Sequence, residues 1–154
     1  DLGPPRSARV IGVVTRPHPG GNQGWPSPYV AATVEMLAHM KDLITDGPTI
    51  VAGDFNFSAQ SSGPRVKDVL DHIRNEHGLR SAYHDFFGVD PGEESHMTLA
   101  WRWDSTRRYH CDLVFVPDDY EVVGVQVGTY EEWTANGVTA RSDHAPVIVD
   151  VRTR

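Results

Sequence analysis

The chain has 154 residues, of which 39% are hydrophobic and 23% charged, and this balance predicts one globular domain. It contains no apolar run of membrane-spanning length and no positively charged start ahead of an apolar stretch, which argues against a membrane protein and a visible signal peptide. The formal net charge of −7 argues against a broad nucleic-acid coat, but carboxylates gathered around a metal would still suit an enzyme acting on phosphodiesters.

The first part of the chain predicts two strands around a helix. Residues 10–15 are apolar and β-branched, as in a buried strand, and 16–28 are rich in Pro and Gly, as in a loop. Apolar residues recur at helical spacing over 29–45, and Asp46-Gly47-Pro48 ends that helix. A short buried strand follows at 49–52.

The second part predicts one more helix and then mainly strands. Apolar residues share one face of a helix over 65–77. Strands are expected at 97–103, 111–116 and 121–127, and a final strand at 145–151. This order predicts an α/β fold in which a mixed sheet carries helices on one face.

A carboxylate and an amide follow the strand at 49–52, in the sequence Gly53-Asp54-Phe55-Asn56. Asp54 and Asn56 point to the same side in extended chain, where they could orient a water molecule and bind a phosphate oxygen. The alternative is a polar turn, because Gly, Asp and Asn all favour turns.

Two later motifs also place acidic or His side chains at strand ends. Asp112, in Tyr109-His110-Cys111-Asp112, begins an apolar strand, where a charge needs a partner such as a His or a metal. In Ser142-Asp143-His144-Ala145-Pro146, Asp143 could bind a hard cation and His144 could transfer a proton. Each motif alone could be a solvated strand end.

Cys111 is the single cysteine of the sequence, so an intrachain disulfide is excluded. It is predicted to be a small core residue.

The ordered set of motifs resembles the endonuclease/exonuclease/phosphatase superfamily from about Val10 to Val151. Further segments are similar to one bacterial branch of it, namely Ser81-Ala82-Tyr83-His84, Gly92-Glu93-Glu94, Thr98, Tyr109-His110-Cys111-Asp112 and Tyr130-Glu131-Glu132-Trp133.

The resemblance implies a role for each motif residue. Asp54 would align the attacking water, and Asn56 would steady the phosphate oxygens. Asp112 would orient His144, which would stabilise charge on the scissile phosphate. Asp143 would be a carboxylate beside the metal, Mg²⁺ or Mn²⁺.

The resemblance also implies that part of the fold lies outside this chain. Members of the superfamily carry an Asn and a metal-binding Glu in a preceding half, which has no counterpart before Val10. We therefore expect a linker or cut end at 1–9 and, at 10–154, the C-terminal half of a four-layer α/β sandwich. A complementary N-terminal half or a homodimer would complete it. His18 is a possible catalytic residue, or simply a loop His.

Basic and aromatic residues alternate in Trp101-Arg102-Trp103 and Arg107-Arg108-Tyr109. Arg102, Arg107 and Arg108 could bind substrate, although a hairpin with a solvated basic tip explains them equally well.

The sequence thus predicts a metal-dependent hydrolase of phosphodiester bonds, possible substrates being DNA or RNA. The alternatives are a small-molecule or lipid phosphatase of the same superfamily, and a non-catalytic module that binds a partner or complementary half. We expect a cytoplasmic location and no membrane partner.

Overall fold

The computed structural model describes residues 8–133 and 141–154. Its main sheet has four strands in the order β1-β2-β6-β3. These strands are β1 (Arg9–Val14), β2 (Thr49–Asp54), β6 (Asp112–Pro117) and β3 (Leu79–Ser81). The pairing of β1 with β2 is parallel and the other two pairings are antiparallel, so the sheet is mixed.

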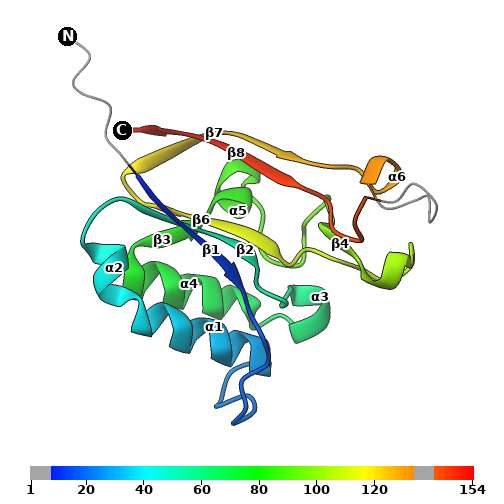
Figure 1. Cartoon of the computed structure of the whole chain (residues 1–154), viewed down its shortest axis with the longest axis horizontal. Helices are drawn as coiled ribbons and strands as arrows, with labels where there is room; N and C mark the ends of the chain where they lie inside the picture. The colour runs from blue at the N-terminus through cyan, green and yellow to red at the C-terminus, as the bar shows by residue number, and fades with distance from the viewer. Residues whose placement is uncertain (1–7, 134–140) are drawn as a thin grey trace.

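Helices cover one face of this sheet (Figure 1). They are α1 (Pro28–His39), α2 (Lys41–Thr45) and α4 (Val66–His77). Ser27 begins α1 by accepting a hydrogen bond from the Val30 amide, and Pro28 supplies a backbone angle that suits the first turn. The predicted α/β fold with helices on one face of a mixed sheet is confirmed.

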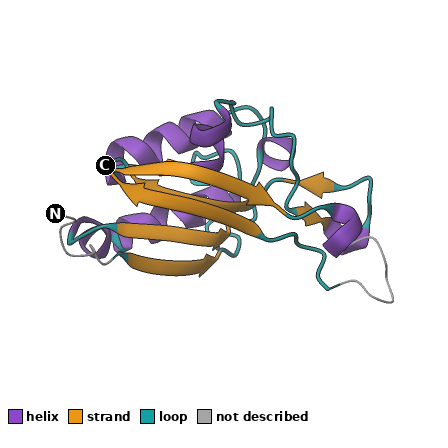
Figure 2. Ribbon diagram, turned by 90° about the horizontal axis from the view of Figure 1, so that it is seen from above, coloured by secondary structure: helices purple, strands orange, loops and turns teal. Residues whose placement is uncertain are grey.

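A second, two-stranded sheet lies over the opposite face, as Figures 1 and 2 show. It is formed by β7 (Tyr120–Val127) and β8 (Val147–Thr153), which pair antiparallel. The described residues therefore make three layers, helices, four-stranded sheet and two-stranded sheet. The four-layer sandwich stays a prediction.

Several predicted element bounds were wrong. The helix expected over 29–45 is interrupted at Met40, which separates α1 from α2. Of the strand expected at 97–103, only β4 (Leu99–Ala100) forms, paired with β5 (Arg108–Tyr109), because Arg102 and Trp103 have positive φ angles and turn the chain into the 3-10 turn η1 (Trp101–Trp103). The described residues also form the short helices α3 (Ala59–Ser62), α5 (Ala82–Phe87) and α6 (Tyr130–Trp133).

The hydrophobic core lies between the four-stranded sheet and its helices. Phe55 and Phe115 are fully buried, and their rings meet edge to face with centroids 5.1 Å apart. Leu37 of α1 and Val69 and Ile73 of α4 pack in the same cluster. This rigid layer fixes the ends of β2 and β6.

A buried arginine ties the two sheets together. Arg80 of β3 is only 5% exposed, and its guanidinium donates hydrogen bonds to Asp85 of α5 and to the carbonyl oxygen of Tyr120 in β7. A buried charge is tolerated when it is paired and hydrogen-bonded in this way.

No helix in the described ranges is long and apolar enough to cross a membrane.

A close approach between the backbones of β1 and β2 requires glycine at position 53. Gly53 lies within β2 opposite Val13, with a φ angle of 148°. A Cβ atom at this position would lie 1.9 Å from the Val13 carbonyl oxygen, so any side chain would push β1 away from β2.

We therefore expect Gly53→Ala to lower the free energy of unfolding by about 2–4 kcal/mol. Gly12→Ala is the matched control, because no atom lies within 4 Å of the Cβ it would add to β1. Urea denaturation of both variants checks this. Equal stabilities of the two would show that the β1–β2 contact tolerates a side chain.

Candidate functional site

Two carboxylates face each other at one end of the four-stranded sheet. Asp54 ends β2 and Asp112 begins β6, and the two are direct partners in the antiparallel ladder. His144 lies in the segment that leads into β8 and forms an isolated bridge with Leu99. The structure therefore brings together three of the predicted site residues, which are far apart in the sequence.

Asn56 holds the Asp54 carboxylate in place. Its backbone amide donates to Asp54 Oδ1 at 2.9 Å, and its Nδ2 donates to Oδ2 at 2.7 Å. Nδ2 also donates to the Thr15 carbonyl oxygen at 3.2 Å, so both of its hydrogens are used. Binding of a phosphate oxygen by this amide would require one of these bonds to open.

The pKa of Asp54 is raised, mainly because the carboxyl is half-buried. The hydrogen bond from the Asn56 backbone opposes this shift, while the nearby Asp112 charge adds to it. A raised pKa makes Asp54 a better proton acceptor than an exposed carboxylate.

His144 is oriented by Asp112. Its Nδ1 donates to Asp112 Oδ2 at 2.9 Å, which leaves Nε2 for other partners. This hydrogen bond is the main reason that the pKa of His144 is raised, against the effect of partial burial. The side chains of His144 and Asp112 remain 32% and 20% exposed, so the pair is accessible from solvent.

Thr98 joins the segments that carry these side chains. It is fully buried, and its hydroxyl oxygen accepts hydrogen bonds from the amides of Cys111 (3.1 Å) and Asp112 (3.0 Å). Its carbonyl oxygen accepts from the Ala145 amide at 2.7 Å. One residue therefore positions both Asp112 and the segment after His144, a role that the sequence did not reveal.

The loop before Thr98 is held by a buried carboxylate, Glu94. Burial alone would raise its pKa, but hydrogen bonds from His84 Nε2 (3.1 Å), Gln60 (3.0 Å) and the Gly92 amide (2.9 Å) lower it to about 2. Glu94 is thus anionic and fixed, and its partner His84 is bonded in turn to Ser81 at 2.7 Å.

Two hollows are lined by residues of this site, one by Asp112 and His144 and the other by Asn56. One, of about 460 Å³, is lined by Asp112, His144 and Trp133 together with apolar atoms of β2, β6 and β8. The other, of about 260 Å³, is lined by Asn56, Tyr29, Tyr109, Trp101 and Arg107.

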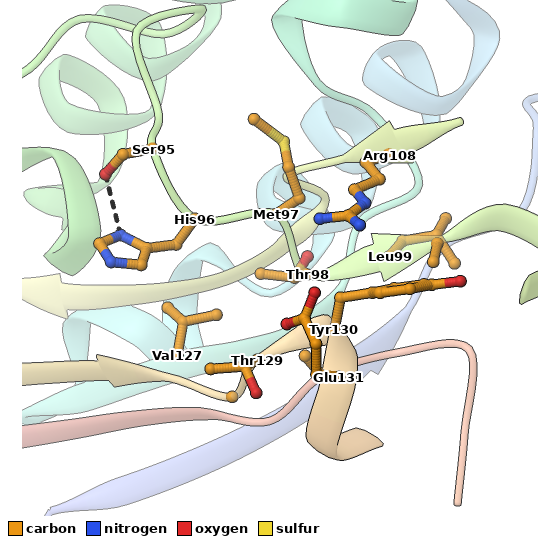
Figure 3. Close-up of a pocket in the computed structure, with 13 residues that line it drawn as sticks. Ser95, His96, Met97, Thr98, Leu99, Arg108, Val127, Thr129, Tyr130 and Glu131 are labelled. Atoms are coloured by element: carbon orange, nitrogen blue, oxygen red, sulfur yellow. Dashed lines mark hydrogen bonds between the residues drawn. The ribbon is translucent and has the colours of Figure 1, made fainter. Parts of the chain in front are cut away.

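The three predicted substrate-binding arginines do not share one surface. The guanidinium carbons of Arg107 and Arg102 lie 3.6 Å and 4.7 Å from the centre of the Trp101 ring, and Arg107 lines the hollow beside Asn56. Arg108 lies over the Tyr130 ring at 4.1 Å. It lines a different pocket of about 190 Å³, shown in Figure 3.

His18 has partners of its own. Its Nε2 lies 2.6 Å from Glu35 of α1, and its Nδ1 accepts a hydrogen bond from the Gly20 amide at 2.9 Å. Its contacts with described residues do not include Asp54 or His144, which favours the interpretation as a loop His.

One group of potential metal ligands occurs among the described residues. Donor atoms of Cys111, Asp112 and His144 all lie within 4.8 Å of one another. Asp143, the predicted metal ligand, is not in this group, although its charge helps to raise the pKa of His144. Magnesium prefers oxygen ligands, so a sulfur, a nitrogen and one carboxylate do not suit it.

Comparisons with known proteins agree with the fold and with the family resemblance. A sequence model of the Endonuclease/Exonuclease/phosphatase family matches residues 1–144. Among solved structures, the human Nocturnin catalytic domain with bound sulfate anion is similar, with a TM-score of 0.58 and 21% identity over 94% of this chain and 46% of that chain. An endonuclease/exonuclease/phosphatase from Beutenbergia cavernae DSM 12333 has a TM-score of 0.58 and 18% identity, over 94% and 36% of the two chains.

A functionally unknown conserved protein from Enterococcus faecalis V583 is also similar, with a TM-score of 0.57 and 16% identity over 94% and 50% of the two chains. The chain thus spans half or less of the length of these three structures, and at such identities the likeness concerns the fold alone. A search of the curated proteins found no match.

We predict that Asp112→Asn lowers the pKa of His144, because the variant removes the charge that stabilises the imidazolium. In the wild type, the His144–Asp112 pair stabilises the fold fully below the ordinary pKa of His. This stabilisation is lost as the pH rises through the raised pKa of His144. The wild type should therefore exceed the variant in stability most clearly just below the ordinary pKa of His, about 6.5, where carboxylates are still charged. NMR titration of the His144 ring measures the shift directly.

The exposed Asp119→Asn, on the turn between β6 and β7, serves as the control and should leave the titration of His144 unchanged. If Asp112→Asn also left it unchanged, Asp112 would not be the residue that sets the charge of His144.

Proposed function

We propose that this chain, which belongs to the endonuclease/exonuclease/phosphatase family, contributes the water-activating and phosphate-stabilising side chains of a divalent-metal-dependent phosphodiesterase. The proposal rests on one observation above all, namely that Asp54, Asp112 and His144 meet at one sheet end with the His144–Asp112 hydrogen bond formed.

The two titrating groups suit attack of water on a phosphate. Asp54 accepts a proton from the attacking water, and its raised pKa favours this. Protonated His144, held by Asp112, places positive charge and a hydrogen-bond donor against a phosphate oxygen. Little covalent chemistry is then required of the protein, since phosphoryl transfer depends mainly on positioning and charge stabilisation.

Asn56 acts in this scheme chiefly by holding Asp54. Both hydrogens of its Nδ2 point to protein oxygens, so it fixes the direction in which Asp54 faces a water. The expected contact between Asn56 and a phosphate oxygen stays a prediction.

The proposed substrate is a nucleic-acid phosphodiester, in DNA or RNA. Arg107 lies against Trp101 in the hollow beside Asn56, which provides a cation for a phosphate and aromatic faces for a base. Arg102 lies against the same ring, and Arg108 would act from the neighbouring pocket. A small-molecule or lipid phosphatase is the second candidate.

The proposed metal is Mg²⁺ or Mn²⁺, which would neutralise charge on the phosphate when bound. Asp143, the carboxylate expected beside the metal, lies outside the three-donor group, and one carboxylate does not make a complete magnesium site. We therefore expect this chain alone to bind magnesium weakly and to hydrolyse phosphodiesters slowly.

A complementary segment or a second copy of the chain would supply the remaining ligands. β1 forms an open edge of the four-stranded sheet, and its Val10 and Val14 side chains are 67% and 76% exposed. Exposed apolar residues on an unpaired edge are typical of a surface that another strand covers. A non-catalytic module that binds such a partner, and a cytoplasmic location, also stay predictions.

The test is hydrolysis of bis(4-nitrophenyl) phosphate in the presence of Mn²⁺. We expect Asp54→Asn to lower kcat/KM by about 10²–10⁴-fold, because it removes the proton acceptor. Asp119→Asn is the matched control and should behave as the wild type. Turnover that survives EDTA, or that Asp54→Asn leaves intact, would contradict the proposal.

A further inference from the structure

Two other potential ligand atoms lie beside one carboxylate oxygen, Oδ2 of Asp112. His144 Nδ1 lies 2.9 Å from this oxygen, and Cys111 Sγ lies 3.8 Å from it. The donors come from two segments, since Cys111 and Asp112 are adjacent at the start of β6 and His144 precedes β8. The Thr98 hydroxyl fixes the backbone of the first two by bonding both of their amides.

Two of the separations are close to those around a tetrahedral zinc ion, and all three potential ligand atoms lie within 4.8 Å of one another. Zinc binds sulfur at about 2.3 Å and imidazole nitrogen or carboxylate oxygen at about 2.0–2.2 Å, so its ligands lie roughly 3.3–3.6 Å from one another. The sulfur–oxygen distance of 3.8 Å is already near that value. The nitrogen–oxygen distance of 2.9 Å needs to open by only a few tenths of an ångström.

The chemistry of the donors selects the same ion. Magnesium and calcium prefer oxygen ligands and do not favour sulfur or imidazole, whereas zinc is commonly held by Cys, His and Asp. Two of the three donors are open to solvent, because His144 is 32% exposed and lines a hollow of about 460 Å³ with Asp112, whereas Cys111, next to Asp112 at the start of β6, is buried. A water molecule from this hollow would complete four ligands.

We propose that Cys111, Asp112 and His144 form a zinc site that shares Asp112 and His144 with the proposed phosphodiesterase chemistry, and that zinc replaces the His144–Asp112 hydrogen bond. On binding, the Cys111 thiol releases its proton to solvent and becomes the thiolate ligand. His144 binds as a neutral imidazole, so a protonated ring also releases one proton. No oxidant or reductant takes part.

Zinc at this position would inhibit phosphodiester hydrolysis, a consequence that rests on the proposed function. The ion would withdraw His144 from the phosphate and neutralise Asp112. Binding itself does not depend on any activity of the chain, so the site is testable even if the proposed hydrolysis fails.

Cobalt(II) reports on the site directly, because a cobalt–thiolate bond gives a charge-transfer absorption in the near ultraviolet that oxygen and nitrogen ligands do not. Cys111 is the only cysteine of the chain, so any such absorption must come from it. We expect the absorption to appear when Co²⁺ is added to the reduced chain with excess Mg²⁺ present. Stoichiometric Zn²⁺ should abolish it.

Two variants make the assignment specific. Cys111→Ser should lose the absorption while keeping its circular dichroism spectrum. His18→Gln should retain it, because His18 pairs with Glu35 outside the proposed site. Absence of the absorption in the folded wild type would overturn the proposal, and so would its loss in His18→Gln.

Hydrolysis assays then separate the two proposals. If bis(4-nitrophenyl) phosphate is cleaved, Zn²⁺ should inhibit the wild type in the presence of Mn²⁺ and lose this effect in Cys111→Ser. Inhibition that is equal in both would place the inhibitory zinc elsewhere. A charge-transfer absorption without hydrolysis would support the zinc site and count against the proposed function alone.

Discussion

The buried hydroxyl of Thr98 is the contact on which the arrangement of the site depends. It accepts hydrogen bonds from the amides of Cys111 and Asp112, and the Thr98 carbonyl oxygen accepts from Ala145. The start of β6 and the entry to β8 belong to different sheets, so this residue joins the two layers at the end where the reactive side chains lie. Arg80 joins the same layers through its bond to Tyr120.

The positions that this junction gives to the side chains of the site determine their pKa values. Half-burial beside Asp112 raises the pKa of Asp54, and the hydrogen bond from His144 to Asp112 raises the pKa of His144. The result is a carboxylate that accepts protons readily next to an imidazole that retains its own. Burial also raises the pKa of the Cys111 thiol, which keeps it protonated and inert unless a metal replaces the proton.

The family resemblance carried by the ordered motifs implied that Asp112 would orient His144, and the structure brings this pair together with Asp54. The motifs could not predict the part played by Thr98, whose partners are 13 and 14 residues away and whose hydroxyl acts through tertiary contacts. The helical spacing of apolar residues did not predict the break at Met40. Strand propensity did not predict the positive φ angles at Arg102 and Trp103. Cys111 is buried, as predicted, but only the fold shows that its sulfur lies near Asp54 and Asp112.

The most direct test compares Thr98→Val with Thr98→Ser. Valine keeps the shape but leaves two buried amides without a partner, at a cost of roughly 1–3 kcal/mol each, whereas serine retains the hydroxyl. Hydrogen exchange and NMR titration of both variants report on the junction and on His144 together. We expect faster exchange of the Cys111 and Asp112 amides and a lower pKa of His144 in Thr98→Val alone. Unchanged exchange and an unchanged His144 titration in Thr98→Val would contradict the central role of this hydroxyl.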